Sequence, residues 1–200
     1  MGNLKIVCLL LGFLLLLSGC RVVLVDPSLE APEPEKSAPL QEQINLQAHI
    51  QYDNRKIVFR GETDLPEGTI LEASKMEYPI GTEPFSVEVG AADPLKETKA
   101  AEKAEVAKEG TFLVVLKRDP QKRYQISLQF RPELQPVPIK EIYGDTGDSI
   151  GASEGLFNYE DNGTEYTGIA LFAPLNTIDD AGFWMGRLEM RPNQKDARPY

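Results

Sequence analysis

The stretch "LQAHIQYDNRKIVFRG", residues 46–61, decides the fold because apolar and polar residues alternate in it on both sides of a turn. Successive side chains of an extended chain point to opposite faces. In the first half one face is apolar and the other polar, with Leu46, Ala48, Ile50 and Tyr52 opposed to Gln47, His49 and Gln51. Asp53-Asn54 then supplies residues that favour a turn. The stretch predicts two antiparallel strands, each with one buried face.

Similar runs recur along the chain and predict an all-β protein. The further predicted strands cover residues 69–78, 85–89, 111–117, 124–130 and 165–173, with a weaker one at 183–190. Clusters of Gly, Pro, Asn and Asp separate these runs, which is typical of short strands joined by turns. The expected fold class is all-β, an antiparallel β-sandwich of the immunoglobulin-like type.

One segment breaks the alternation: "DPLKETKAAEKAEVAKEG", residues 93–110, is rich in Ala, Glu and Lys. Asp93 is placed to cap a helix and Pro94 suits the first helical position. The composition therefore predicts a short helical or irregular charged insertion to about Lys103, followed by a hairpin that turns at Glu109-Gly110. Its mixed charges are those of a solvated surface.

The N-terminus has the layout of an export signal. Lys5 precedes an almost entirely apolar run at residues 6–17, and Ser18-Gly19 are small. The run is shorter than the roughly 20 residues that a membrane-spanning helix needs. The four residues at 17–20, "LSGC", resemble a bacterial lipobox. That resemblance implies cleavage between Gly19 and Cys20 and acylation of Cys20; the alternative is an uncleaved N-terminal anchor, extended by the apolar residues 22–25.

The segment that follows, residues 26–42, alternates Pro with Glu, Ser and Ala and shows no apolar period. Such a composition does not bury enough surface to fold, so it is expected to be a semi-extended tether. The predicted domains are a lipoprotein signal peptide at 1–19, a lipidated cysteine with its tether at 20–43, a β-sandwich at 44–191 and a polar tail at 192–200.

Few residues in the chain are suited to catalysis. Cys8 and Cys20 are the only cysteines, so the processed domain has no thiol for a disulfide, a nucleophile or a zinc site. His49 is the only histidine, and it is predicted on the outward face of its strand. The sequence thus predicts a protein that is not an enzyme and holds no cofactor or metal.

Carboxylates remain as candidates. Glu141, Asp145 and Asp148 form a weak acidic cluster in "KEIYGDTGDS", and a second group lies in "YEDNGTE", namely Glu160, Asp161 and Glu165. Neither matches the spacing of a calcium loop. The "DNGT" at residues 161–164 is interpreted as a hairpin turn.

The net charge of −10 opposes binding to nucleic acid, and no glycine-rich loop leads from a strand into a helix as a nucleotide site requires. The expected partners are the membrane, held through diacylglycerol and acyl chains on Cys20, and an envelope protein of unknown identity. The expected location is extracytoplasmic, with lipid anchoring to the cell membrane. Because Arg21 rather than Asp follows the cysteine, a source with two membranes would send the protein to the outer one.

Two longer stretches resemble the immunoglobulin-like or fibronectin-III-like sandwiches of bacterial surface lipoproteins. They are "FRGETDLPEGTILEAS" at 59–74, with its Gly-x-Thr-x-Leu-Pro-x-Gly-Thr-x-Leu pattern, and "FRPELQPVPIKEIYGDTGDSIGASEG" at 130–155. In those domains a strand ending in Gln-Pro leads to another strand and a glycine-bearing loop. The resemblance implies a compact extracytoplasmic sandwich and carries over no catalytic residue. Leu65 is expected to close one end of it, before a turn through Pro66 and Gly68.

Three functions fit these observations. The first is a lipid-anchored, non-catalytic module with a binding or structural role in the cell envelope. The second is an envelope-acting enzyme that uses a carboxylate pair. The third is an inhibitor or folding modulator that pairs with other proteins through an exposed strand edge.

Overall fold

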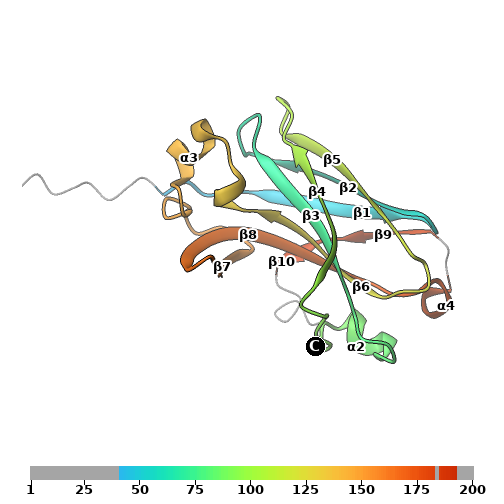
Figure 1. Ribbon diagram of the computed structural model, residues 1–200. Helices are drawn as coiled ribbons and strands as arrows, with labels where there is room; N and C mark the ends of the chain where they lie inside the picture. The colour runs from blue at the N-terminus through green and yellow to red at the C-terminus, as the bar shows by residue number, and fades with distance from the viewer. Residues whose placement is uncertain (1–40, 183–184, 193–200) are drawn as a thin grey trace, which may run out of the picture. The chain divides into compact units, whose positions relative to one another are not determined.

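Two antiparallel sheets pack face to face in the computed structural model, which describes residues 41–182 and 185–192 (Figure 1). Sheet I has the order β5-β2-β1-β9, and sheet II has the order β10-β8-β6-β3-β4 with β7 paired to β8. The strands are β1 Leu46–Tyr52, β2 Lys56–Thr63, β3 Ile70–Glu77, β4 Thr98–Glu105, β5 Thr111–Lys117, β6 Tyr124–Phe130, β7 Leu156–Asp161, β8 Thr164–Leu175, β9 Gly186–Glu189 and β10 Arg191–Pro192. The predicted all-β sandwich is confirmed.

The core lies between the sheets and consists of the inward residue of each alternating pair. Fully buried side chains come from both sheets: Ile50, Phe59 and Leu116 from sheet I, and Leu71, Ile126, Leu128 and Ile169 from sheet II. The apolar face of residues 46–52 packs against the opposite sheet, as the alternation of apolar and polar residues predicts.

Two of the predicted turns join neighbouring strands. Between β1 and β2, the Asp53 carboxylate accepts hydrogen bonds from the backbone N–H groups of Arg55 and Lys56 at 2.7 and 2.9 Å. Between β7 and β8, Asn162 and Gly163 both have positive φ, at 50° and 80°, as a tight hairpin turn requires. Both predictions are confirmed.

The turn at residues 65–69 carries the chain from sheet I to sheet II. Leu65 is buried, the Thr69 N–H donates to the Pro66 carbonyl at 3.2 Å, and Gly68 has a φ of 82°. The expected turn, with Leu65 closing one end of the core, is confirmed.

The helical or irregular insertion predicted up to about Lys103 is wrong for residues 98–103, because β4 occupies residues 98–105 and pairs with β3. Ala and Lys favour a helix locally. The free edge of β3 offers a complete set of backbone partners, however, and the period-two residues Ala104 and Val106 bury themselves against the core. Tertiary pairing therefore overrides local propensity. Residues 93–97 are irregular, the second of the two predicted forms.

The hairpin predicted around Glu109-Gly110 is wrong in its pairing. A turn is present, since the Gly110 N–H donates to the Ala107 carbonyl at 2.9 Å and the Ala107 N–H donates to the Thr111 carbonyl at 2.8 Å. However, β4 belongs to sheet II and β5 pairs with β2 in sheet I. The turn therefore joins the two sheets.

The strand predicted at 85–89 is also wrong, because Pro84–Glu88 is the short helix α2. Pro84 at the first helical position favours this start. Only Val87 of its apolar side chains is fully buried, while Phe85 is 72% exposed. One helical turn is enough to bury this single side chain, so the segment does not need to pair with a neighbouring strand.

A helix stands where the resemblance implies a strand after Gln-Pro. Helix α3 covers Val137–Tyr143 and follows the 3₁₀ helix η1, Pro132–Leu134, after Gln135 and Pro136. Ile139 and Tyr143, four residues apart, share the buried side of α3, which is the helical spacing. The glycine-bearing loop that the resemblance implies does follow the helix. The remaining short helix is α4, Ile178–Ala181.

No helix among the described residues is long and apolar enough to cross a membrane. The signal, Gly19, Cys20 and the tether up to residue 40 lie outside the described residues, as do Phe183 and Trp184 in the weaker predicted strand. The described chain is already paired at Glu42, whose N–H donates to the Ser149 carbonyl at 3.0 Å.

Ionisation of buried tyrosines is expected to destabilise the fold at high pH. Burial raises the pKa of Tyr78, Tyr124 and Tyr143 to about 12 in each case. An unfolded tyrosine ionises near pH 10. The fold favours the neutral phenols. The stability that their burial contributes is fully present below about pH 10 and is lost as pH rises towards 12. We expect tyrosinate absorbance to rise together with unfolding, followed by circular dichroism; complete ionisation near pH 10 with the fold intact would contradict this.

Candidate functional site

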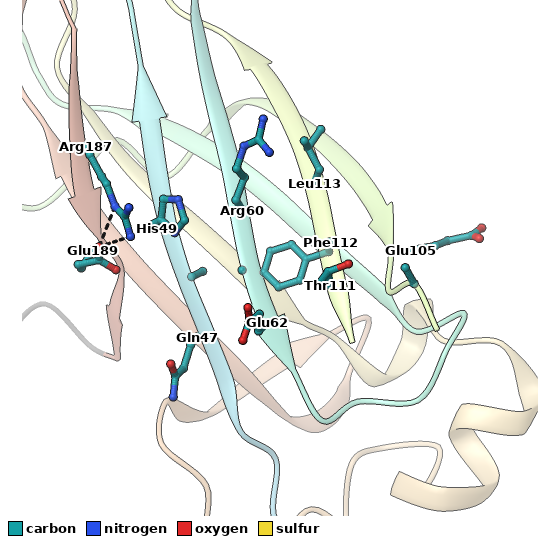
Figure 2. Close-up of a pocket in the computed structure, with 13 residues that line it drawn as sticks. Gln47, His49, Arg60, Glu62, Glu105, Thr111, Phe112, Leu113, Arg187 and Glu189 are labelled. Atoms are coloured by element: carbon teal, nitrogen blue, oxygen red, sulfur yellow. Dashed lines mark hydrogen bonds and ion pairs between the residues drawn. The ribbon is translucent and has the colours of Figure 1, made fainter. Parts of the chain in front are cut away.

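No element of the described part of the chain covers the outward face of sheet I, and we call it the open face. Across the strands it presents a row formed by Glu189 on β9, His49 on β1, Arg60 on β2 and Leu113 on β5 (Figure 2). All of these side chains are exposed or half-exposed, so no described element packs over them. A parallel row lies on each side of this row. One consists of Gln47, Glu62 and Thr111, and the other of Arg187, Gln51, Val58 and Val115.

Apolar side chains gather at the β5 side of the open face. Leu113 is 50% exposed and Val115 is 44% exposed. Val58 lies directly opposite Val115 on β2 and is half-buried. Scattered exposed apolar residues need no explanation, but these three are neighbours on adjacent strands. They form a continuous apolar strip.

A hollow of about 700 Å³ lies on the open face and extends past β5 to Glu105 on β4. Gly61 borders this hollow but occupies an inward position of β2, opposite the buried Ala48 and Phe112. A Cβ at Gly61 would lie 2.1 Å from the Gln47 carbonyl oxygen and 2.5 Å from Cζ of Phe112. Only glycine lets the Phe112 ring and the β1 backbone approach so closely.

The charges of the open face are unevenly satisfied. Arg187 and Glu189 form an ion pair at 2.9 Å on β9. Within the described part of the chain, the Arg60 guanidinium makes no ion pair or hydrogen bond. An exposed guanidinium beside an apolar strip can bind a carboxylate with two parallel hydrogen bonds.

A second hollow, of about 440 Å³, lies at the β7–β8 hairpin. Asp148 borders it together with Glu160 and Glu165, so the structure brings together members of both predicted acidic groups. Glu141 on α3 and Asp145 in the following loop are exposed and do not line this hollow. Glu160 and Glu165 are direct cross-strand partners. Among the described residues, no group of three His, Cys, Asp or Glu side chains is arranged to hold a metal ion.

Aromatic residues line and support this second hollow. Phe157, Tyr159 and Tyr166 form a stack, with ring centroids 4.9 and 5.5 Å apart. They are half-buried on the outside of sheet II, whereas Tyr143 is buried in the core. Tyr143 therefore contributes to the core, and the three stacked rings do not.

Arg131 holds the stack against sheet II. Its guanidinium lies 5.2 Å from the centroid of the Tyr159 ring and forms ion pairs with Glu72 at 3.2 Å and Glu133 at 2.6 Å. The Tyr159 hydroxyl donates to Glu133. Burial by itself would lower the pKa of Arg131, but the hydrogen bond with Tyr159 and the two carboxylates raise it above its ordinary value. With its charges paired internally, this cluster has a structural role.

His49 lies where the sequence places it, half-exposed on the outward face of β1. The alternation of residues 46–52 located it, but the same reasoning missed Arg60 and the apolar strip. The available signal was the "TFLVVLK" of β5, in which both sets of alternate residues contain apolar side chains. A strand of that kind has apolar side chains on both faces, and only one face can reach the core.

Comparisons with known proteins identify no relative: no family model matches the chain, no curated protein matches it significantly, and no solved structure matches it significantly.

Proposed function

We propose that this protein is a lipid-anchored, extracytoplasmic binding module of the cell envelope, and that its open face contacts another envelope protein without catalysing a reaction. The anchoring part rests on the sequence of residues 5–20, with its apolar run and its lipobox-like end at Cys20. The predicted tether, from residue 26 up to residue 40, would place the sandwich away from the membrane surface.

The observation that carries the binding part is Arg60, which has no partner among the described residues and lies beside the apolar strip of Val58, Leu113 and Val115. Protein interfaces combine apolar contacts with a few charged groups, and arginine is among the residues that contribute most to their affinity. The partner that fits presents a carboxylate to Arg60 and an apolar side chain to the strip. This local chemistry differs from the overall net charge of −10.

The enzyme alternative is less well supported. Glu160 and Glu165 lie opposite each other at the second hollow, but both are exposed. The neighbouring Tyr159 has its hydroxyl committed to Glu133. A carboxylate pair in glycoside hydrolysis needs one member kept protonated, commonly by burial in an apolar pocket. These two carboxylates have no such surroundings.

Charge reversal at Arg60 tests the proposal. The Arg60→Glu variant is expected to lose about tenfold or more in affinity for the envelope protein that the wild-type chain captures, because a carboxylate would then repel the partner's carboxylate. Binding is measured by crosslinking capture from the chain's own cell envelope. Lys96→Glu, an equal charge reversal at an exposed loop position, is the control and should bind as the wild type does. Equal capture by Arg60→Glu and wild type would refute the assignment of the open face.

A further inference from the structure

β5 forms the outer edge of sheet I. The N–H and C=O groups of successive residues in β5 point alternately towards β2 and away from it. The Thr63 N–H donates to the Gly110 carbonyl and the Arg118 N–H to the Arg55 carbonyl, which fixes the hydrogen-bonded positions between β2 and β5. In an antiparallel pair every second residue bonds to the neighbouring strand. Phe112, Val114 and Leu116 therefore bond to β2, and the residues between them direct their N–H and C=O groups towards the free edge.

The two ends of this edge are already occupied. The Thr111 carbonyl accepts from the Ala107 N–H at 2.8 Å, and the Lys117 carbonyl accepts from Nζ of Lys75 at 2.6 Å. Among the described residues, no backbone group bonds to the edge at Leu113 or Val115. The unpaired stretch is thus centred on Val114, and the exposed side chains of Leu113 and Val115 border it.

Other strand edges of the described chain carry features that discourage pairing. The edge strand β4 has the sequence TKAAEKAE and carries exposed lysines and glutamates on both of its faces. β9 and β10 have only four and two residues, and β7 ends in Glu160 and Asp161. Charged and very short edge strands are how proteins avoid edge-to-edge association. β5 is seven residues long and has apolar side chains at its centre.

We propose that β5 pairs antiparallel with β5 of a second copy of this chain, which joins two four-stranded sheets into one continuous sheet. In the register that uses the free groups, Leu113 of one copy lies opposite Val115 of the other, and the two-fold axis passes at Val114. Each such pair exchanges two hydrogen bonds. It also places an apolar side chain beside another on the open face.

Charge favours this orientation and a second copy as the occupant. Lys117 and its cross-strand neighbour Lys56 make one end of the edge basic. At the other end, Thr111 lies opposite Glu62 on β2, and Glu105 borders the same hollow. Antiparallel pairing sets the basic end of each copy against the acidic end of the other. Lys117 faces the small Thr111 of the second copy and reaches towards Glu62 beyond it.

The oligomeric state of the detergent-solubilised full chain tests this proposal. Sedimentation velocity over a range of concentrations is expected to show a reversible dimer. Val115→Lys should raise the dissociation constant by about tenfold or more, because lysine replaces an apolar cross-strand contact and is the usual guard of an edge strand. Ile80→Lys, the same kind of change at a fully exposed position in the loop between β3 and α2, should dimerise as the wild type does.

A cysteine experiment tests the register. In the full chain with Cys8 and Cys20 replaced by serine, an equal mixture of Leu113→Cys and Val115→Cys chains is expected to form a disulfide-linked dimer. Paired residues of a hydrogen-bonded site have Cα atoms about 5.5 Å apart, within the range of a disulfide. Either variant alone should crosslink weakly, because like positions are about 8 Å apart in this register.

The outcomes separate this inference from the proposed function. A monomer at every concentration, a dimer insensitive to Val115→Lys, or equal crosslinking of each cysteine variant alone would each overturn the strand pairing. Arg60→Glu should leave the dimer intact, because Arg60 lies on β2 and is separated from the second copy by β5. Loss of envelope binding with an intact dimer therefore reports on the open face alone.

Discussion

Replacing Cys20 with serine is expected to remove the protein from the membrane fraction, or to leave it as an unprocessed precursor of higher mass. Each buried methylene of an acyl chain contributes about 0.8 kcal/mol of membrane affinity, and stable anchoring takes two or more chains. Under the proposed anchoring, serine offers no thiol for the diacylglycerol group, so the lipid-dependent cleavage proposed before residue 20 is not expected to occur. The measurement is fractionation of cells followed by mass spectrometry of the chain.

Cys8→Ser is the matched control, because Cys8 lies within the proposed signal peptide, residues 1–19. It should leave the mature mass and the membrane attachment unchanged. A Cys20→Ser chain with the mature mass that is still bound to the membrane would show that another part of the chain does the anchoring.

Truncating Phe130 to alanine is expected to destabilise the sandwich by about 3–5 kcal/mol. Phe130 is fully buried at the end of β6, between its cross-strand partners Leu71 on β3 and Ile169 on β8. Its ring also meets Tyr143 of α3 edge to face, with centroids 5.4 Å apart. The variant therefore loses one of the contacts that hold α3 against the core, besides leaving a cavity.

Urea unfolding followed by circular dichroism measures this loss. A domain of this kind has a total stability of about 5–15 kcal/mol, so the change would be a large share of it. Phe85→Ala is the control: Phe85 is 72% exposed on α2, and its truncation should change stability by no more than about 0.5 kcal/mol. A Phe130→Ala chain as stable as Phe85→Ala would contradict the assigned packing of α3.

The sequence predicted strands best where one face meets the core and the other meets water. In β1, β2 and β5 the alternation of residues and the alternation of burial agree. It failed at β4, where alanines and lysines that favour a helix pair instead with the edge of β3. Such pairing depends on a neighbour distant in sequence, and local propensity contains no information about it.

In the candidate sites, too, local alternation predicted the position of single residues but not which residues lie side by side. The outward position of His49 followed from period two alone. Its neighbours Arg60 and Leu113 could not be assigned, because a cross-strand row depends on the register between β1, β2 and β5. Asp148 came next to Glu160 and Glu165 for a related reason, since the loop after α3 folds beside the β7–β8 hairpin.

Photo-crosslinking in intact cells tests the central claim most directly. A photoreactive residue in place of His49, at the centre of the open face and away from the β5 edge, is expected to form an adduct with one envelope protein. The same residue in place of Ile80, fully exposed in the loop between β3 and α2, should form no such adduct. Absence of an adduct at His49, or the same adduct at both positions, would contradict the claim that the open face is the binding surface.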